Sequence, residues 1–146
     1  MQDDVEFGFR QIVDIALKAL SPAVNDPSTA ATCIDQLGRL LIRAVGRRMG
    51  PVVVATGGGH LVLPAPTFTD LLDLAVEQIR QYGRADMATA LRLLRVLAEL
   101  RALTTDPEVL ARLRSHADRI REAGRASFAP EDTEELERRY ASVRVG

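Results

Sequence analysis

Apolar residues recur at intervals of three and four along most of the chain, which is the spacing of a helix that buries one face. The first two stretches of this kind cover residues 3–20 and 27–47. Four more follow, at residues 67–82, 86–103, 107–124 and 131–143. The connections are short, so consecutive helices are expected to pack roughly antiparallel. The pattern predicts an all-α bundle of five to six helices.

The spacing of apolar residues changes once, between the second and third predicted helices. Residues 52–55 and 60–63 form two short β-type runs around a glycine-rich connection, which predicts one small β-hairpin at about residues 52–63. Three glycines also suggest a phosphate-binding loop, but that loop needs a Lys followed by Ser or Thr at the start of a helix. Here a strand and Pro64 follow instead. The stretch is therefore interpreted as a hairpin.

The predicted helix at residues 86–103 is apolar over an unusually wide arc. Such a helix is either central in its bundle or covered by a partner subunit, so we expect a homo-oligomer. The length of 146 residues suits one domain, and residues 1–146 are predicted to form a single helical domain. The last two helices, at about residues 107–143, are candidates for a peripheral position.

Composition and charge narrow the range of functions. An apolar fraction of 47%, a charged fraction of 27% and a net charge of −1 are ordinary for a soluble globular protein. The balance of charges and the low aromatic content argue against nucleic-acid binding, so no nucleic-acid partner is expected. Arg39, Arg43 and Arg47 form a basic row on the second helix, which we interpret as a solvated face, with acidic lipid or an acidic partner as the alternative.

The chain shows no signal of secretion or membrane insertion. Its acidic start, MQDDVEF, lacks the basic and apolar regions of a signal peptide. No window approaches the roughly 18 apolar residues of a membrane span, so the chain as given is expected to be cytoplasmic. Cys33 is the single cysteine and lies on an apolar helix face, where it is predicted to be a small buried residue rather than a nucleophile.

No recognisable catalytic set is present. Carboxylate pairs occur at Asp70 and Asp73 and at Asp73 and Glu77, but they fall on polar faces of amphipathic helices and are interpreted as solvated. His60 beside the predicted turn has no second ligand at metal-binding spacing. The sequence therefore predicts no catalytic residue, no metal site and no cofactor, and it favours a non-enzymatic protein.

The segment SPAVNDP between the first two helices combines prolines with small polar residues and Asp26. Asp26 and Pro27 suit a helix start, as an N-cap followed by the first helical residue, and Asp106 and Pro107 repeat the device. The alternative is a ligand site, because helix N-terminal amides can hold an anion while Asp26 suits a cation or amine. The candidate binding residues are Arg10, Asp14, Ser21, Asn25, Asp26 and Thr29.

Two long stretches carry a family resemblance. The segment DVEFGFRQIVDIALKALSPAVNDPSTA at residues 4–30 resembles the most characteristic part of a bacterial family of predicted membrane proteins, domain of unknown function 2254. Residues 64–97, from PAPTFTDLL to LRLLRVL, are similar to the segment that follows in that family. The family motif maps onto Phe7, Gly8, Arg10, Asp14, Ser21, Pro22, Asn25, Asp26, Pro27 and Thr29.

The resemblance implies a membrane context but no reaction. It implies that full-length relatives carry N-terminal transmembrane helices, lie in the bacterial inner membrane and continue into a region that contains this domain. The present chain departs from that pattern, because its sequence lacks the membrane part. We therefore expect a non-enzymatic soluble helical domain with a role in assembly, regulation or ligand sensing. The alternative is a small-ligand-binding protein or enzyme that uses the polar corner between the first two helices.

Overall fold

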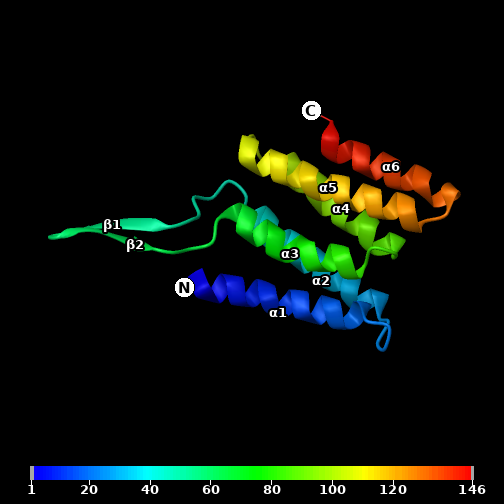
Figure 1. Cartoon of the computed structure of the whole chain (residues 1–146), viewed down its shortest axis with the longest axis horizontal. Helices are drawn as coiled ribbons and strands as arrows, with labels where there is room; N and C mark the ends of the chain where they lie inside the picture. Colours follow the sequence, from blue (N-terminus) through cyan, green and yellow to red (C-terminus); the bar gives the residue numbers. More distant parts are fainter. Residues whose placement is uncertain (1, 146) are drawn as a thin grey trace.

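The computed structural model describes residues 2–145 and shows, over that range, six helices and a two-stranded hairpin (Figure 1). The elements are α1 (Gln2–Leu20), α2 (Pro27–Ala44), β1 (Val52–Thr56), β2 (Gly59–Leu63), α3 (Phe68–Tyr82), α4 (Met87–Arg101), α5 (Pro107–Ser127) and α6 (Pro130–Arg144). The prediction of an all-α bundle with one hairpin between the second and third helices is confirmed.

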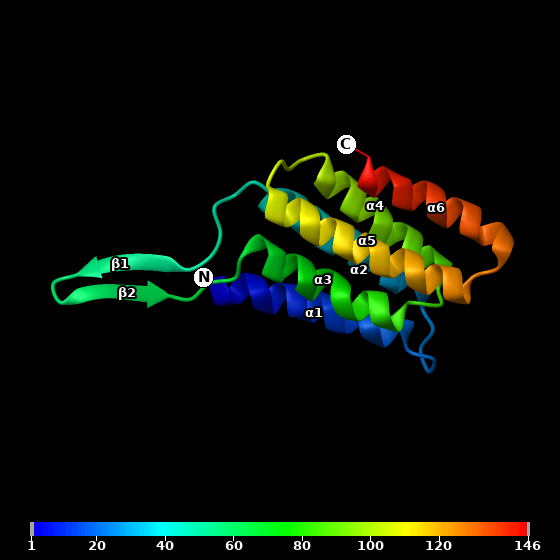
Figure 2. The ribbon, with the colours of Figure 1, turned by 45° about the horizontal axis from the view of Figure 1, so that its top comes forward.

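The helices pack alongside one another as an up-and-down bundle, and the hairpin projects from one end (Figures 1 and 2). α1 packs against α2 and α3, while α4 contacts α2, α3, α5 and α6. The start of α1 lies at the same end as the hairpin, and the corner between α1 and α2 lies at the opposite end (Figure 1). Two distinct ends, about one helix length apart, are thus available for function.

The wide apolar arc of α4 is covered by helices of the same chain. Leu94, Leu97 and Leu100 are completely buried in the core, where α4 meets its four neighbouring helices. The first of the two predicted alternatives, a central position in the bundle, is therefore confirmed, and this arc gives no reason to expect a partner subunit. Self-association stays a prediction and needs another surface. Cys33 is buried in the same core, as predicted.

Three apolar residues that continue the helical spacing within the predicted helices are exposed rather than buried. Val5, Tyr82 and Leu103 have exposed fractions of 46%, 62% and 53%. Each lies at or just beyond the end of a helix, where neighbouring helices no longer cover it. Helical periodicity continues the apolar pattern to these residues, but the lengths of the adjacent helices determine where burial ends.

The largest differences from the predicted helix ends are at the C-termini of α2 and α5. α2 ends at Ala44 rather than at Arg47, because Val45 is extended and Gly46 has a φ of 83°, a left-handed conformation that favours glycine. Arg47 therefore lies in the connection to the hairpin.

α5 continues past Gly124 to Ser127, although glycine commonly ends a helix. A Cβ atom at Gly124 would lie 2.6 Å from Cδ2 of Leu136, so this glycine allows α6 to approach α5 closely.

Candidate functional site

The hairpin is the most exposed part of the molecule and also one of its most apolar parts. All ten residues of β1 and β2 are exposed. The six large aliphatic side chains among them have exposed fractions between 41% and 59%. They are Val52, Val53, Val54, Leu61, Val62 and Leu63. A projection of this kind is typical of a contact surface, because monomeric proteins rarely leave contiguous apolar patches uncovered.

The strand register divides these side chains between two faces. Val52 pairs with Leu63 and Val54 with Leu61, so these four residues share one face, here called the aliphatic face. Val53 pairs with Val62 and Ala55 with His60, and these four form the lighter face. The strands are joined by Gly57 and Gly58, which complete the glycine-rich turn that the sequence predicted. One face of the hairpin is thus entirely aliphatic over two successive cross-strand pairs.

The hairpin and its flanks carry no formal charge. No Asp, Glu, Lys or Arg occurs between Arg48 and Asp70. Natural proteins usually protect exposed strands with charged residues, prolines or bulges, since bare strands pair with other chains. Here Pro51 and Pro64 flank the strands, and the strands themselves are unprotected. The absence of charge favours a role in which another surface covers the hairpin.

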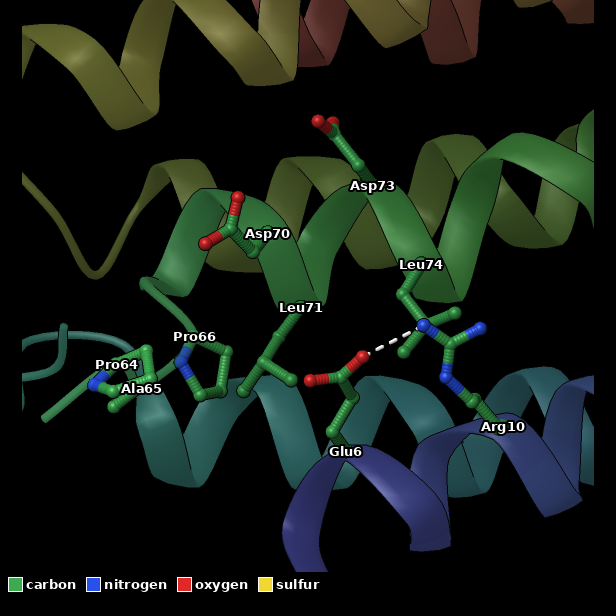
Figure 3. Close-up of a pocket in the computed structure, with 9 residues that line it drawn as sticks. All are labelled: Glu6, Arg10, Pro64, Ala65, Pro66, Asp70, Leu71, Asp73 and Leu74. Atoms are coloured by element: carbon green, nitrogen blue, oxygen red, sulfur yellow. Dashed lines mark hydrogen bonds and ion pairs between the residues drawn. The ribbon is translucent and has the colours of Figure 1, made fainter. Parts of the chain in front are cut away.

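A polar hollow lies at the base of the hairpin (Figure 3). It has a volume of about 480 Å³ and lies between α1, the connection that follows β2 and the start of α3. Glu6 and Arg10 of α1 line it and form an ion pair of 2.7 Å. Pro64, Ala65, Pro66, Asp70, Leu71, Asp73 and Leu74 complete its lining. The hollow and the hairpin together place polar and apolar surface side by side at one end of the bundle.

The carboxylates of the hollow already have partners within the chain. Asp70 accepts a hydrogen bond of 2.8 Å from the backbone N–H of Thr67, and the Thr67 hydroxyl accepts from the N–H of Asp70, which together form a capping box. Asp73 points away from α1 (Figure 3) and pairs with Arg112 at 2.8 Å and with His116 at 2.7 Å. These groups therefore stabilise helix ends and helix contacts.

His116 is the one buried histidine among the described residues, and its burial was not predicted. Its Nε2 atom lies 2.7 Å from Oδ1 of Asp73, and its Nδ1 atom lies 3.8 Å from Oε2 of Glu77 without a hydrogen-bond partner. Burial lowers the pKa of His116, against the opposing effect of the hydrogen bond and charge of Asp73. The signal was present, since His116 falls in the helical stripe of Leu113, Ala117 and Ile120.

Asp73 and Glu77 are not simply solvated, contrary to the prediction. Both face α5, where Glu77 pairs with Arg119 at 3.3 Å in addition to Arg80 at 2.7 Å on its own helix. Burial raises the pKa of Glu77, but the hydrogen bond and charge of Arg80 and the charge of Arg119 outweigh it, so the net pKa lies below its usual value. The polar face of α3 thus forms an ionic network with α5.

The structure brings together only part of the predicted polar corner. Arg10 lines the hollow near the hairpin, and Asp14 is exposed on α1. The Ser21 hydroxyl donates to the carbonyl oxygen of Lys18 at 2.7 Å, and Asn25 has a φ of 45° in the turn. A binding role for these residues stays a prediction.

Asp26 and Thr29 do meet, in the geometry of a helix N-cap. The Asp26 carboxylate accepts from the N–H of Thr29 at 3.1 Å and from its hydroxyl at 2.6 Å. These hydrogen bonds from Thr29 lower the pKa of Asp26. Asp86 and Thr89 repeat the arrangement at the start of α4, with distances of 2.9 Å and 2.6 Å. A pair used at two helix starts is explained by capping alone.

We expect Asp26→Ala to lower the thermal unfolding midpoint by a few degrees, because the first turn of α2 loses its cap. Asp26→Asn should keep most of the stability, since Asn caps helices about as well as Asp. Differential scanning calorimetry of the two variants measures this difference. Equal losses in both variants would show that the charge of Asp26, rather than its capping hydrogen bonds, stabilises the corner.

Comparison with known proteins places this architecture in a family. A family model described as "Predicted membrane protein (DUF2254)" matches residues 1–99, which include the hairpin and the hollow. An uncharacterized protein of Mycobacterium bovis and two of Mycobacterium tuberculosis strains are each 34% identical over 133 residues. The match covers 90% of this chain but 26% of each relative, so the chain spans about a quarter of their length.

No solved structure matches the chain. Within the part of the chain that the structure describes, no helix is both long enough and apolar enough to cross a membrane.

Proposed function

Because the chain belongs to the DUF2254 family of predicted membrane proteins, we propose that it serves as a non-enzymatic assembly domain, in which the hairpin binds another protein surface. The helical bundle acts as a rigid support, and the hairpin is the element that it presents. The proposal depends on one observation, the exposed and uncharged aliphatic surface of β1 and β2.

Contact with another surface would stabilise a hairpin of this kind. A two-stranded hairpin alone in water is at best marginally stable, and a third surface is normally needed to support it. Here the helices do not supply that surface, because both faces of the hairpin are exposed. Contact with another protein would remove the aliphatic side chains from water and stabilise the strands at the same time.

The surroundings of the hairpin also suit a protein contact. Interfaces combine an apolar, uncharged centre with a polar rim. The hairpin provides such a centre, and the Glu6–Arg10 pair in the adjacent hollow provides charged groups at its edge. The carboxylates of the hollow are held by capping and ion pairs, which supports a structural rather than a catalytic use of that polar surface.

Thiol labelling tests the proposal. In a Cys33→Ala background, Leu61→Cys places a probe on the hairpin, and Ala88→Cys places a matched probe on an exposed site of α4. We expect the ratio of the Leu61→Cys to the Ala88→Cys maleimide rate to be about tenfold lower in intact cells than in dilute purified protein, because covered thiols react slowly. An unchanged ratio would show that the hairpin is free in the cell and would overturn the assembly role.

A further inference from the structure

We propose that the surface covering the aliphatic face is the same face of a second copy of this chain, so that two hairpins pack against each other about a two-fold axis. This inference rests on the proposed assembly function and names its partner. The aliphatic face consists of Val52, Val54, Leu61 and Leu63, as defined above.

The shape of the face is self-complementary in an antiparallel arrangement. Its large side chains lie at the base and middle of the hairpin, whereas the tip ends in Thr56 and Gly59. A Cβ atom added at Gly57, Gly58 or Gly59 would meet nothing within 4 Å, so the tip leaves open space. When two hairpins lie antiparallel, the bulky base of each faces the small tip of the other. This is the repeated, isologous contact that a two-fold axis requires.

The area indicates a reversible dimer. At their exposed fractions the four side chains each leave on the order of 80 Å² accessible, so two copies cover roughly 600 Å² of aliphatic side chain. This area is below the roughly 1,000 Å² expected of a stable specific interface, so it fits only a weak, transient contact. We therefore expect dissociation in the micromolar range, not a permanent complex.

Electrostatics permits the contact. The face carries no charge, and the nearest formal charges in the sequence are Arg48 on one side and Asp70 on the other. Two copies therefore bring no like charges together at the centre of the interface. Depletion of charged residues at the centre is the compositional signal that distinguishes interfaces from ordinary surface.

The observations favour a second copy over a lipid bilayer. The outer edges of both strands have backbone groups that need hydrogen bonds, and the apolar interior of a bilayer supplies none. The hairpin also lacks the Lys and Arg residues that attract anionic lipids and the Trp and Tyr residues that mark membrane interfaces. A protein surface can cover the aliphatic side chains and leave the backbone groups of the strand edges hydrogen-bonded to water.

Two matched double variants test the proposal by sedimentation velocity over a concentration series. Val54→Lys with Leu61→Glu places an opposite-charge cross-strand pair on the aliphatic face, and Val53→Lys with Val62→Glu places the same pair on the lighter face. All four positions are exposed and the net charge is unchanged, so both variants should fold, as circular dichroism will verify.

We expect the native chain to dimerise, the lighter-face variant to dimerise within about threefold of it, and the aliphatic-face variant to bind at least about tenfold more weakly. A native chain that stays monomeric at about 100 µM, or two variants that weaken equally, would overturn the proposal. So would a monomeric chain that floats with phosphatidylcholine–phosphatidylglycerol vesicles. If the dimer is absent while the Leu61→Cys probe stays protected in cells, the assembly function stands with a different protein partner. If neither the dimer nor the protection of the Leu61→Cys probe is observed, both proposals fail.

Discussion

Leu94→Ala is expected to lower the free energy of unfolding by about 3–4 kcal/mol. Leu94 is completely buried on α4, the helix that contacts four others, so its removal leaves a cavity that several rigid neighbours must close together. The loss combines the transfer free energy of the deleted atoms with the free energy of the residual cavity. Urea denaturation followed by circular dichroism at a fixed protein concentration measures it.

The matched control is Leu103→Ala, just beyond the end of the same helix. Leu103 is about half exposed, and its truncation should change stability by less than about 0.5 kcal/mol. The pair of variants also tests how α4 is covered. A loss at Leu103 as large as the loss at Leu94 would mean that a second subunit buries this end of the helix, contrary to the packing within the chain.

Periodicity was enough to locate the helices, but not to show what covers them. The six apolar stripes predict six helices within a few residues, because each stripe must face a core. The width of the α4 arc was ambiguous, since a central position in one chain and a subunit interface demand the same residues. Only the three-dimensional arrangement decides between them: α4 packs against α2, α3, α5 and α6, and its Leu97 and Leu100 are completely buried within the chain.

For the hairpin, the sequence predicts the strands but not their exposure. The valine run at residues 52–54 predicts a strand, but a run of that kind is usually buried on both faces, so its exposure could not be predicted. Exposure depends on how far the hairpin extends beyond the helices, which is a tertiary property. By contrast, the capping role of Asp26 was predictable, because Asp followed by Pro recurs at Asp106 and Pro107, and Asp106 also caps its helix.

The α3–α5 network depends on contacts between residues far apart in sequence. His116 meets Asp73 across 43 positions, and Arg119 meets Glu77 across 42. Local patterning places each carboxylate on a polar face and says nothing about the helix that will pack there. The network matters physically because it holds a histidine in a buried position with one ring nitrogen unpartnered.

That histidine is expected to make stability fall as the pH is lowered from 7 to 5. Burial lowers the pKa of His116 in the folded state, so the unfolded chain takes up a proton near pH 6.5 while the folded chain does not. The stabilisation is complete above the unfolded pKa and is lost as the pH falls toward the folded pKa. The slope reaches up to about 1.4 kcal/mol per pH unit for this one proton. Urea denaturation at intervals between pH 5 and 7 measures it.

Two histidine variants isolate the effect, because the chain contains only His60 and His116. His116→Gln should flatten the pH dependence, since the amide can still bond to Asp73 but does not titrate. His60→Gln, on the exposed hairpin, should leave the slope unchanged. Glu77 does not interfere, because its lowered pKa confines its contribution to more acidic solutions. Stability that rises between pH 7 and 5 would show that attraction to Asp73 and Glu77 outweighs burial, and that His116 is charged in the folded protein.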